Sequence, residues 1–127
     1  MRSLKVLLVD DNAAFLRGAR ELVAALPQVA SAACAASGAE ALARVRESPP
    51  DLVLTDLMMP EMSGFELIHL LHALPASPRL VAVSLHETAE FRCAARRSGA
   101  EDLIAKREFQ ALIPGLIASA AGVRTSL

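Results

Sequence analysis

Charged and hydroxyl side chains follow four of the short apolar runs in this 127-residue chain. In chain order they are Asp10 and Asp11, then Asp56, Ser84 and Lys106. Three carboxylates that meet in one crevice repel one another unless a cation neutralises them. Mg²⁺ takes carboxylate oxygens and keeps positions open for phosphoryl oxygens, which a hydroxyl and an ammonium can also bind. The set therefore predicts a phosphoryl-transfer site in which a carboxylate is the nucleophile.

These side chains meet only if the apolar runs are neighbouring parallel strands. The runs alternate strictly with segments of helical periodicity. We expect strands over residues 4–9, 29–35, 52–55, 80–83 and 103–105, and helices over residues 13–26, 38–48, 64–74, 88–98 and 108–121. This alternation predicts an α/β fold: a single doubly wound (βα)5 domain, flavodoxin-like, with a five-stranded parallel sheet in the order 2-1-3-4-5. That order places the first and third strands side by side, and with them the three carboxylates.

Capping and breaking residues indicate where the helices begin and end. Asp11 or Asn12 is a natural N-cap for the first helix, and Ser37 with Glu40 matches a capping box. Pro114 lies inside the last helical segment, so that helix is either kinked or divided into two shorter pieces.

Composition excludes several classes of function. The formal net charge is −1, and the chain has no Trp, no Tyr and only four Phe, so we expect no direct binding of nucleic acid. No apolar run is long enough to cross a membrane or to form a signal peptide, so we expect a cytoplasmic protein that makes no membrane contact. Cys34 and Cys93 are expected to be small buried residues in a reducing compartment. One domain over residues 1–122 is expected, with a tail over residues 123–127 where a linker could begin.

Three stretches and one single residue match a known family. They are VLLVDD over residues 6–11, DLVLTDLMMPEMSG over residues 51–64, GAEDLIAK over residues 99–106, and Ser84. From about residue 5 to residue 121, the chain resembles the receiver (phosphoacceptor) domain of two-component response regulators. The middle stretch, with its Pro and Gly at the family's spacing, is the most specific single motif.

The resemblance implies a role for each residue of the predicted site. The implied roles are Asp56 as phosphoacceptor, Asp10, Asp11 and Asp56 as ligands of the cofactor Mg²⁺ together with the backbone carbonyl of Met58, Ser84 as switch hydroxyl, and Lys106 as phosphoryl-binding lysine. A sensor histidine kinase is the implied phosphodonor. The output partner is then an effector domain beyond residue 127, a separate target protein, or a second copy paired through the fourth and fifth helices. Such a domain is not an enzyme, since it assists only its own phosphotransfer and dephosphorylation.

Two departures from the family pattern lie beside Lys106. Leu103 stands where the family usually has an aromatic switch residue, so a modest read-out centred on the fourth helix is expected. Arg107 stands where the family usually has a Pro that follows the lysine and is associated with a cis peptide. The Lys106–Arg107 bond is therefore open between cis and trans.

Leu85 and His86 are expected to modulate the site, together with Leu103. Leu85 follows the switch hydroxyl, where the family usually has a small residue, and His86 lines the mouth of the site. Leu85 and Met58 are large and apolar, so they should hinder the water that removes the phosphoryl group. Leu85 should also limit how far Ser84 moves.

Other interpretations remain beside the phosphorylated switch. The chain could be a receiver-like scaffold that works without phosphate. It could also be a slow aspartyl-phosphate phosphohydrolase, although such phosphatases carry a second carboxylate two residues after the nucleophile, where this chain has Met58. The Asp10–Asp11 pair could serve only to cap the first helix. His69 and His72 have the spacing of metal ligands but no third partner, and are expected to be surface or packing residues.

Overall fold

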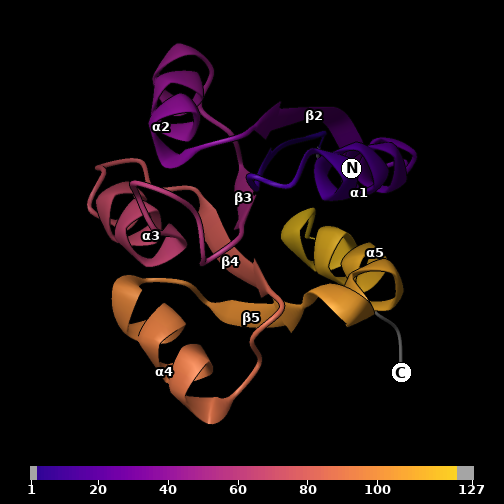
Figure 1. Cartoon of the computed structure of the whole chain (residues 1–127). Coiled ribbons are helices and arrows are strands. Elements are labelled where there is room, and N and C mark those ends of the chain that lie inside the picture. The colour runs from indigo at the N-terminus through magenta and orange to yellow at the C-terminus, as the bar shows by residue number, and fades with distance from the viewer. Residues whose placement is uncertain (1–2, 123–127) are drawn as a thin grey trace.

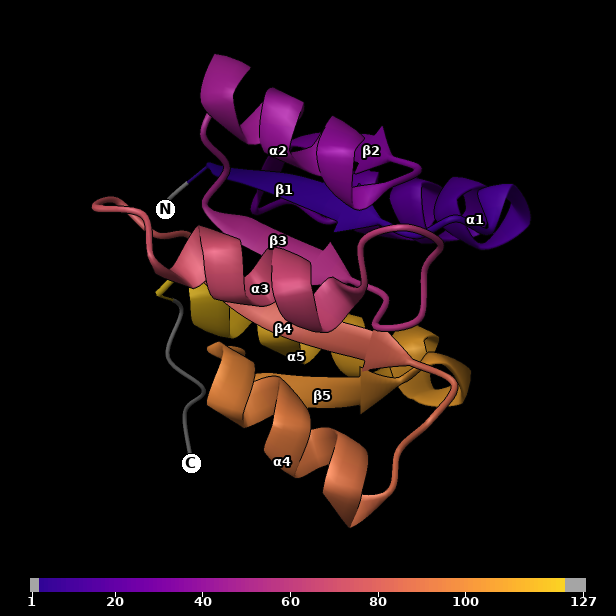
Figure 2. The same cartoon turned by 60° about the vertical axis from the view of Figure 1, so that its left-hand side comes forward.

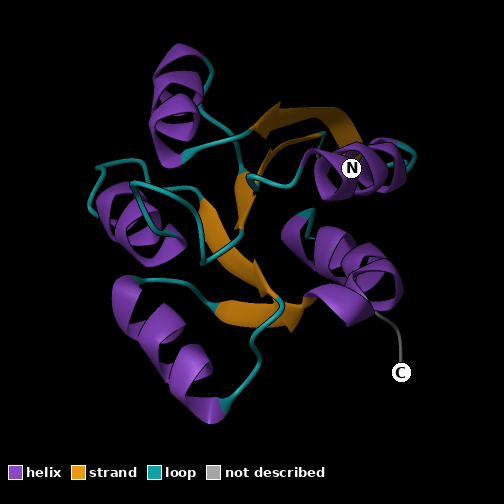
Figure 3. Cartoon of the chain, in the orientation of Figure 1, coloured by secondary structure: helices purple, strands orange, loops and turns teal. Residues whose placement is uncertain are grey.

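A five-stranded parallel sheet with helices on both faces forms the protein, as the computed structural model of residues 3–122 shows (Figures 1 and 3). The strands are β1 (Leu4–Val9), β2 (Val29–Ala35), β3 (Leu52–Thr55), β4 (Arg79–Ser84) and β5 (Asp102–Ala105). The helices are α1 (Ala13–Ala24), α2 (Gly38–Glu47), α3 (Gly64–His72), α4 (Ala89–Ser98) and α5 (Phe109–Ala120), with a 3₁₀ turn over Lys106–Glu108. The sheet order β2-β1-β3-β4-β5 confirms the predicted fold. The expected tail, residues 123–127, lies outside the described residues, as do residues 1 and 2.

Both faces of the sheet are buried, which explains why its strands are almost continuously apolar. Side chains alternate between the faces of a strand. Leu4, Val6 and Leu8 of β1 pack against α1 and α5, whereas Leu7 and Val9 pack against the layer of α2, α3 and α4. The two helical layers lie on opposite sides of the sheet in Figure 1. The result is two hydrophobic cores that share one rigid sheet.

The strand register brings the site residues to one edge. Val9 is paired with Thr55, and the Asp56 N–H donates to the Val9 carbonyl at 2.8 Å. Asp10 and Asp56 therefore leave the sheet as neighbours. Ser84 is paired with Ala105, the residue before Lys106. All strands point toward this edge (Figure 2), as a parallel sheet requires.

Capping side chains start four helices at or near the same edge. Asn12, rather than Asp11, caps α1 by accepting the Phe15 N–H at 3.1 Å. Ser37 caps α2 by accepting the Glu40 N–H, as the predicted capping box requires, whereas Glu40 accepts the N–H of Ala36 and not that of Ser37. The remaining two caps are Ser63 for α3 and Thr88 for α4.

The last helix is continuous, which settles one open expectation. α5 runs unbroken through Pro114, so the alternative of two shorter pieces is wrong. Pro114 is exposed, and water can bond the carbonyl that its missing N–H leaves unpaired. The described residues contain no cis peptide bond, so Lys106–Arg107 is trans.

The expectation that both cysteines are buried is wrong. Cys93 is exposed and Cys34 is half-buried. Cys93 lies on α4, where only Ala95 is buried. A separation of two residues turns a helix by about 200°, so position 93 faces away from the sheet.

No helix of the described residues is long and apolar enough to cross a membrane.

Gly64 allows α3 to begin in direct contact with the backbone of Asp56 and Leu57. Its N–H donates to the Leu57 carbonyl at 2.9 Å, and a Cβ built on it would lie 1.8 Å from the Asp56 carbonyl oxygen. That overlap involves backbone on both sides, so no side-chain rotation can relieve it. The glycine therefore fixes the loop that presents Asp56.

We expect Gly64→Ala to lower the free energy of unfolding by more than about 3 kcal/mol, since the loop and α3 must move apart. Gly18→Ala is the matched control because a Cβ there meets nothing within 4 Å. It lies inside α1 and should stabilise the protein by up to ~1 kcal/mol. Urea unfolding measures both, and similar values for the two variants would contradict the steric argument.

Candidate functional site

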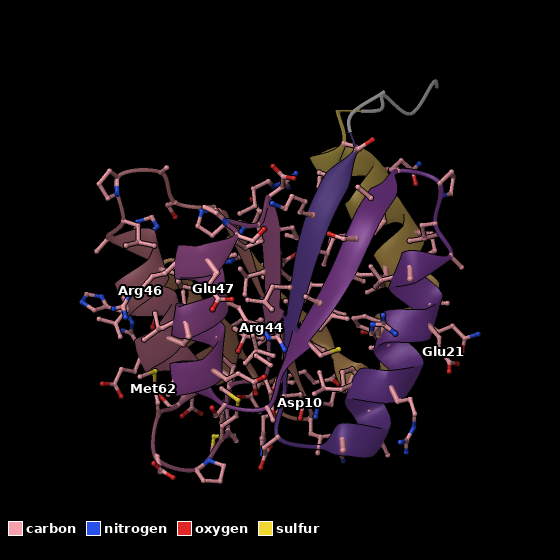
Figure 4. The ribbon with its side chains drawn as sticks, turned by 90° about the horizontal axis from the view of Figure 1, so that it is seen from above. Asp10, Glu21, Arg44, Arg46, Glu47 and Met62 are labelled. Carbon is pink, nitrogen blue, oxygen red and sulfur yellow. The ribbon has the colours of Figure 1, made fainter. Side chains whose placement is uncertain are left out.

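A cavity of about 380 Å³ opens at the carboxyl edge of the sheet. Its lining residues are Asp10, Asp11, Asn12, Asp56, Met58, Leu85, His86 and Lys106. They come from the ends of β1, β3, β4 and β5, and Figure 4 shows Asp10 where β1 ends. A larger groove of about 640 Å³ runs between α1 and α5, but it is mostly apolar and shares only Lys106 with the acidic cavity. The chemistry predicted from the sequence therefore belongs to the smaller cavity.

Three carboxylates gather in this cavity. Asp10, Asp11 and Asp56 each offer an oxygen atom, and these atoms lie within 4.8 Å of one another. Asp10 is 1% exposed and Asp56 is 6% exposed, whereas Asp11 is open to solvent. Asp10 Oδ1 accepts the Asn12 N–H at 2.9 Å, and Asp56 Oδ1 accepts the Leu57 N–H at 2.8 Å. Each buried carboxylate is thus oriented by backbone through one of its oxygens.

Lys106 faces the other oxygen of both buried carboxylates. Its Nζ lies 2.7 Å from Asp10 Oδ2 and 3.7 Å from Asp56 Oδ2. The same ammonium sits 4.6 Å from the centroid of the Phe15 ring, in cation–π geometry. One ammonium against three carboxylates leaves two formal negative charges in excess. The site is therefore suited to a divalent cation.

The donor set also fits Mg²⁺. Asp10 Oδ2 is buried and lies 2.7 Å from the Lys106 ammonium, so this oxygen already faces positive charge. All three candidate side-chain ligands are hard oxygen donors, and the exposure of Asp11 leaves room for water, which Mg²⁺ retains in proteins. Met58 lines the same cavity, and its backbone carbonyl stays a prediction for the fourth ligand.

Ser84 is close to the site but does not line the cavity. It is fully buried, and its hydroxyl oxygen accepts the His86 N–H at 3.0 Å. The structure therefore brings Asp10, Asp11, Asp56 and Lys106 together, while the Ser84 hydroxyl is engaged by its own loop. The bond uses the hydroxyl oxygen as an acceptor, so its O–H remains available as a donor.

The three residues expected to modulate the site occupy different surroundings. Leu85 is 75% exposed and lines the cavity, so it forms part of the rim. His86 lines the cavity, and its ring stacks on Phe91 of α4 at 4.8 Å between ring centroids. Leu103 is buried beneath α4, and its carbonyl accepts a hydrogen bond from the Arg92 guanidinium at 2.9 Å.

The two histidines of α3, His69 and His72, are exposed, as expected for surface residues.

The ion pair between Glu87 and Arg107 is not predicted by the sequence. These residues are 20 positions apart in loops without periodicity, so no sequence pattern signals their contact. The hydrogen bond from Arg107 lowers the pKa of Glu87, so the pair stays charged at neutral pH.

Burial raises the pKa of Asp56 above its ordinary value, and the neighbouring Asp10 carboxylate raises it further. The Lys106 ammonium and the backbone N–H groups of Leu57 and Met58 act in the opposite direction and do not fully compensate. The charged form of Asp56 is thus less stable in the folded protein than in the unfolded chain. This carboxylate is held at a cost to stability, as is common at functional sites.

We expect Asp56→Asn to stabilise the protein at pH 7. Between the ordinary pKa of 3.8 and the raised one, the folded protein binds more protons, so stability falls as the pH rises through that window. Asn removes this penalty. The melting temperature at pH 7 should therefore be higher in the variant than in wild type. Calorimetry without divalent cations measures it. The gain should vanish below the window, and a loss of stability at pH 7 would contradict the assignment.

Comparison with known protein sequences agrees with this geometry. The family model of the response regulator receiver domain matches residues 6–116. The chain is 34% identical over 104 residues to protein-glutamate methylesterase/protein-glutamine glutaminase 5 of Myxococcus xanthus, covering 81% of this chain and 30% of that protein. It is 30% identical over 118 residues to the nitrate/nitrite response regulator protein NarL of Escherichia coli, covering 92% of this chain and 55% of that protein. The chain thus spans between about a third and just over half of these relatives.

Solved structures show the same fold. The response regulator domain of Thermotoga maritima CheB superposes with a TM-score of 0.81 and 31% identity, covering 98% of this chain and 100% of that one. The receiver domain of the putative response regulator NarL from Mycobacterium tuberculosis gives a TM-score of 0.88 at 23% identity, again over 98% and 100% of the two chains. Because the family model covers most of the sequence and the site lies where its motifs meet, this chain belongs to the response regulator receiver domain family.

Proposed function

We propose that this domain is a phosphorylation-activated signalling switch that accepts a phosphoryl group on Asp56 from a sensor histidine kinase. The observation that carries the proposal is the setting of the Asp56 carboxylate. Its Oδ1 is held by a backbone N–H, and its Oδ2 faces Lys106 across the cavity at 3.7 Å. Asp10 is a poorer nucleophile because Lys106 lies only 2.7 Å from its second oxygen. Asp11 is exposed and has no cation beside it among the described ion pairs.

The residues of the cavity divide the work of phosphoryl transfer. A carboxylate oxygen of Asp56 attacks the phosphorus in line with the leaving group, so one P–O bond forms as the bond to the donor breaks. Lys106 then pairs with a phosphoryl oxygen in place of a carboxylate. When bound, Mg²⁺ would supply the positive charge that offsets the phosphoryl oxygens. Asp10, Asp11, Asp56 and the Met58 carbonyl are its proposed ligands.

A role as a phosphohydrolase is less well supported. Asp56 is followed two positions later by Met58, which can neither donate nor accept a proton. His86 lines the cavity, but its ring is stacked on Phe91, and it is not a carboxylate of the kind that such phosphatases carry. We therefore propose that the domain only assists its own phosphotransfer and the slow loss of the phosphoryl group.

The output of the switch is proposed to reach a partner through α4 and α5. Both helices carry exposed side chains, including Leu112 of α5 at 47% exposure and Arg97 of α4. The occupant of that surface would be an effector domain beyond residue 127, a separate target, or a second copy. An output domain fits the observation that the chain spans only part of its curated relatives.

Phosphorylation by a small phosphodonor tests the proposal directly. Acetyl phosphate with Mg²⁺ should add one phosphoryl group, seen by intact mass, and Asp56→Asn should abolish the addition. Asp102→Asn is the control, because this exposed carboxylate lies at the start of β5, outside the cavity.

The variant Asp11→Ala tests whether the labelling depends on a bound metal ion. It should raise the Mg²⁺ concentration needed for half-maximal labelling at least about 10-fold. Labelling that persists in Asp56→Asn would overturn the assigned acceptor. A wild type that is never labelled would favour the phosphate-independent scaffold, and labelling independent of Mg²⁺ would leave Asp10 and Asp11 as capping residues.

The lifetime of the phosphoryl group should depend on the apolar rim. Met58 is 54% exposed and Leu85 is 75% exposed, and both line the cavity that water must enter. Met58→Asn adds an amide that can hold a water, so the group should be lost about 5-fold faster, the equivalent of one net hydrogen bond of ~1 kcal/mol. Leu85→Ala should act in the same direction by opening the rim.

The rate of phosphate release under identical Mg²⁺ measures this effect. Leu112→Ala is the matched control, an exposed leucine on α5 that does not line the cavity. Equal rates in wild type, Met58→Asn and Leu85→Ala would show that the rim does not govern the lifetime.

A further inference from the structure

The ion pair between Glu87 and Arg107 joins the loop that follows Ser84 to the 3₁₀ turn that begins at Lys106. Arg107 Nε donates to Glu87 Oε2 at 2.9 Å, and a terminal guanidinium nitrogen donates to Glu87 Oε1, so the pair is bidentate. Glu87 lies three residues after Ser84, and Arg107 directly follows Lys106. A planar, two-bond contact of this kind fixes orientation as well as distance.

The loop that contains Glu87 is short and is fixed at both ends. β4 ends at Ser84, and Thr88 caps α4 by accepting the Phe91 N–H. Only residues 85–87 lie between them. α4 itself is held to β5, because the Arg92 guanidinium donates to the Leu103 carbonyl at 2.9 Å. Any displacement of the loop must therefore stretch the Glu87–Arg107 contact or move α4.

Ser84 is not among the residues that line the cavity in this arrangement. It is fully buried, it accepts the His86 N–H at 3.0 Å, and it does not line the space above Asp56. To donate to a phosphoryl oxygen on Asp56, the hydroxyl has to approach the cavity, and its bond from the His86 N–H couples the loop to that movement. The contact that restrains the loop thus favours the conformation in which Ser84 is withdrawn.

We propose that the Glu87–Arg107 ion pair is a latch that holds the β4–α4 loop in the resting conformation and opens when a phosphoryl group binds at Asp56. The second half of this statement rests on the proposed function, whereas the first concerns the unmodified protein alone. The latch shifts an equilibrium between two conformations, so breaking it must favour any ligand that selects the other conformation.

The latch is weak and responds to ionic strength. The Arg107 side chain is 68% exposed and that of Glu87 is 33% exposed, so water and salt screen the pair. It therefore tunes the switch and does not block it. At high ionic strength wild type should behave like a variant that lacks the pair.

Amide hydrogen exchange in the unmodified protein tests the resting latch. Protection of the His86 N–H, which reports directly on its bond to Ser84, should fall about 2- to 5-fold in Glu87→Gln and in Arg107→Gln, the usual effect of an exposed ion pair. The double charge exchange, Glu87→Arg with Arg107→Glu, should restore it. Glu40→Gln is the matched control, since it breaks an exposed ion pair with Arg44 on α2, remote from the loop. Unchanged His86 protection in both single variants would overturn the latch.

Binding of beryllofluoride with Mg²⁺, a mimic of the phosphoryl group, tests its opening. Both Gln variants should bind the mimic about 2- to 5-fold more tightly than wild type, and the difference should disappear at about 1 M salt. Weaker or equal binding by the variants at low salt would overturn the latch. Failure of wild type itself to bind the mimic would count against the proposed function, while the exchange result would still decide the resting contact.

Discussion

Repulsion among three carboxylates is the constraint that the rest of this structure accommodates. Their oxygens lie within 4.8 Å because β1 and β3 are adjacent parallel strands that end together. Two of the three carboxylates are buried, so water screens the repulsion between them only weakly. Backbone N–H groups fix one oxygen of each, and Lys106 faces the other. The domain folds with this charge in place because none of it enters the sheet, which stays apolar on both faces.

Separating the apolar sheet from the polar edge makes the edge adjustable. The two cores are filled by side chains that alternate along each strand, so a shift there would open cavities or cause overlap. The loops beyond the strand ends are held by single contacts: a cap, an ion pair, or one hydrogen bond to Ser84. Each of these contacts is small compared with burial of a core residue. A change of charge at Asp56 can therefore rearrange the loops without disturbing the strands.

The strands, their order and the acidic cluster could be predicted from sequence because they depend on local pattern. The run from Val6 to Val9 is apolar and ends at two aspartates. The register of the parallel strands then places Asp10 beside Asp56. The prediction was weaker where long-range geometry decides. The orientation of the Ser84 hydroxyl depends on a neighbouring N–H, the Glu87–Arg107 contact joins distant loops, and Pro114 is tolerated because it faces solvent. The exposure of Cys93 follows from which side α4 turns to the sheet, which composition alone does not reveal.

The contact between the Lys106 ammonium and the Phe15 ring has an optical consequence. The chain contains neither Trp nor Tyr, so it has no intrinsic fluorophore of useful strength. Phe15 lies in α1 beside the cavity, packs edge-to-face against Phe109 at 5.5 Å, and stands 4.6 Å from the ammonium. An indole placed there by Phe15→Trp would be the sole emitter in the molecule. Its emission wavelength would depend on whether the Lys106 ammonium lies over the indole ring, so fluorescence would report the position of this lysine.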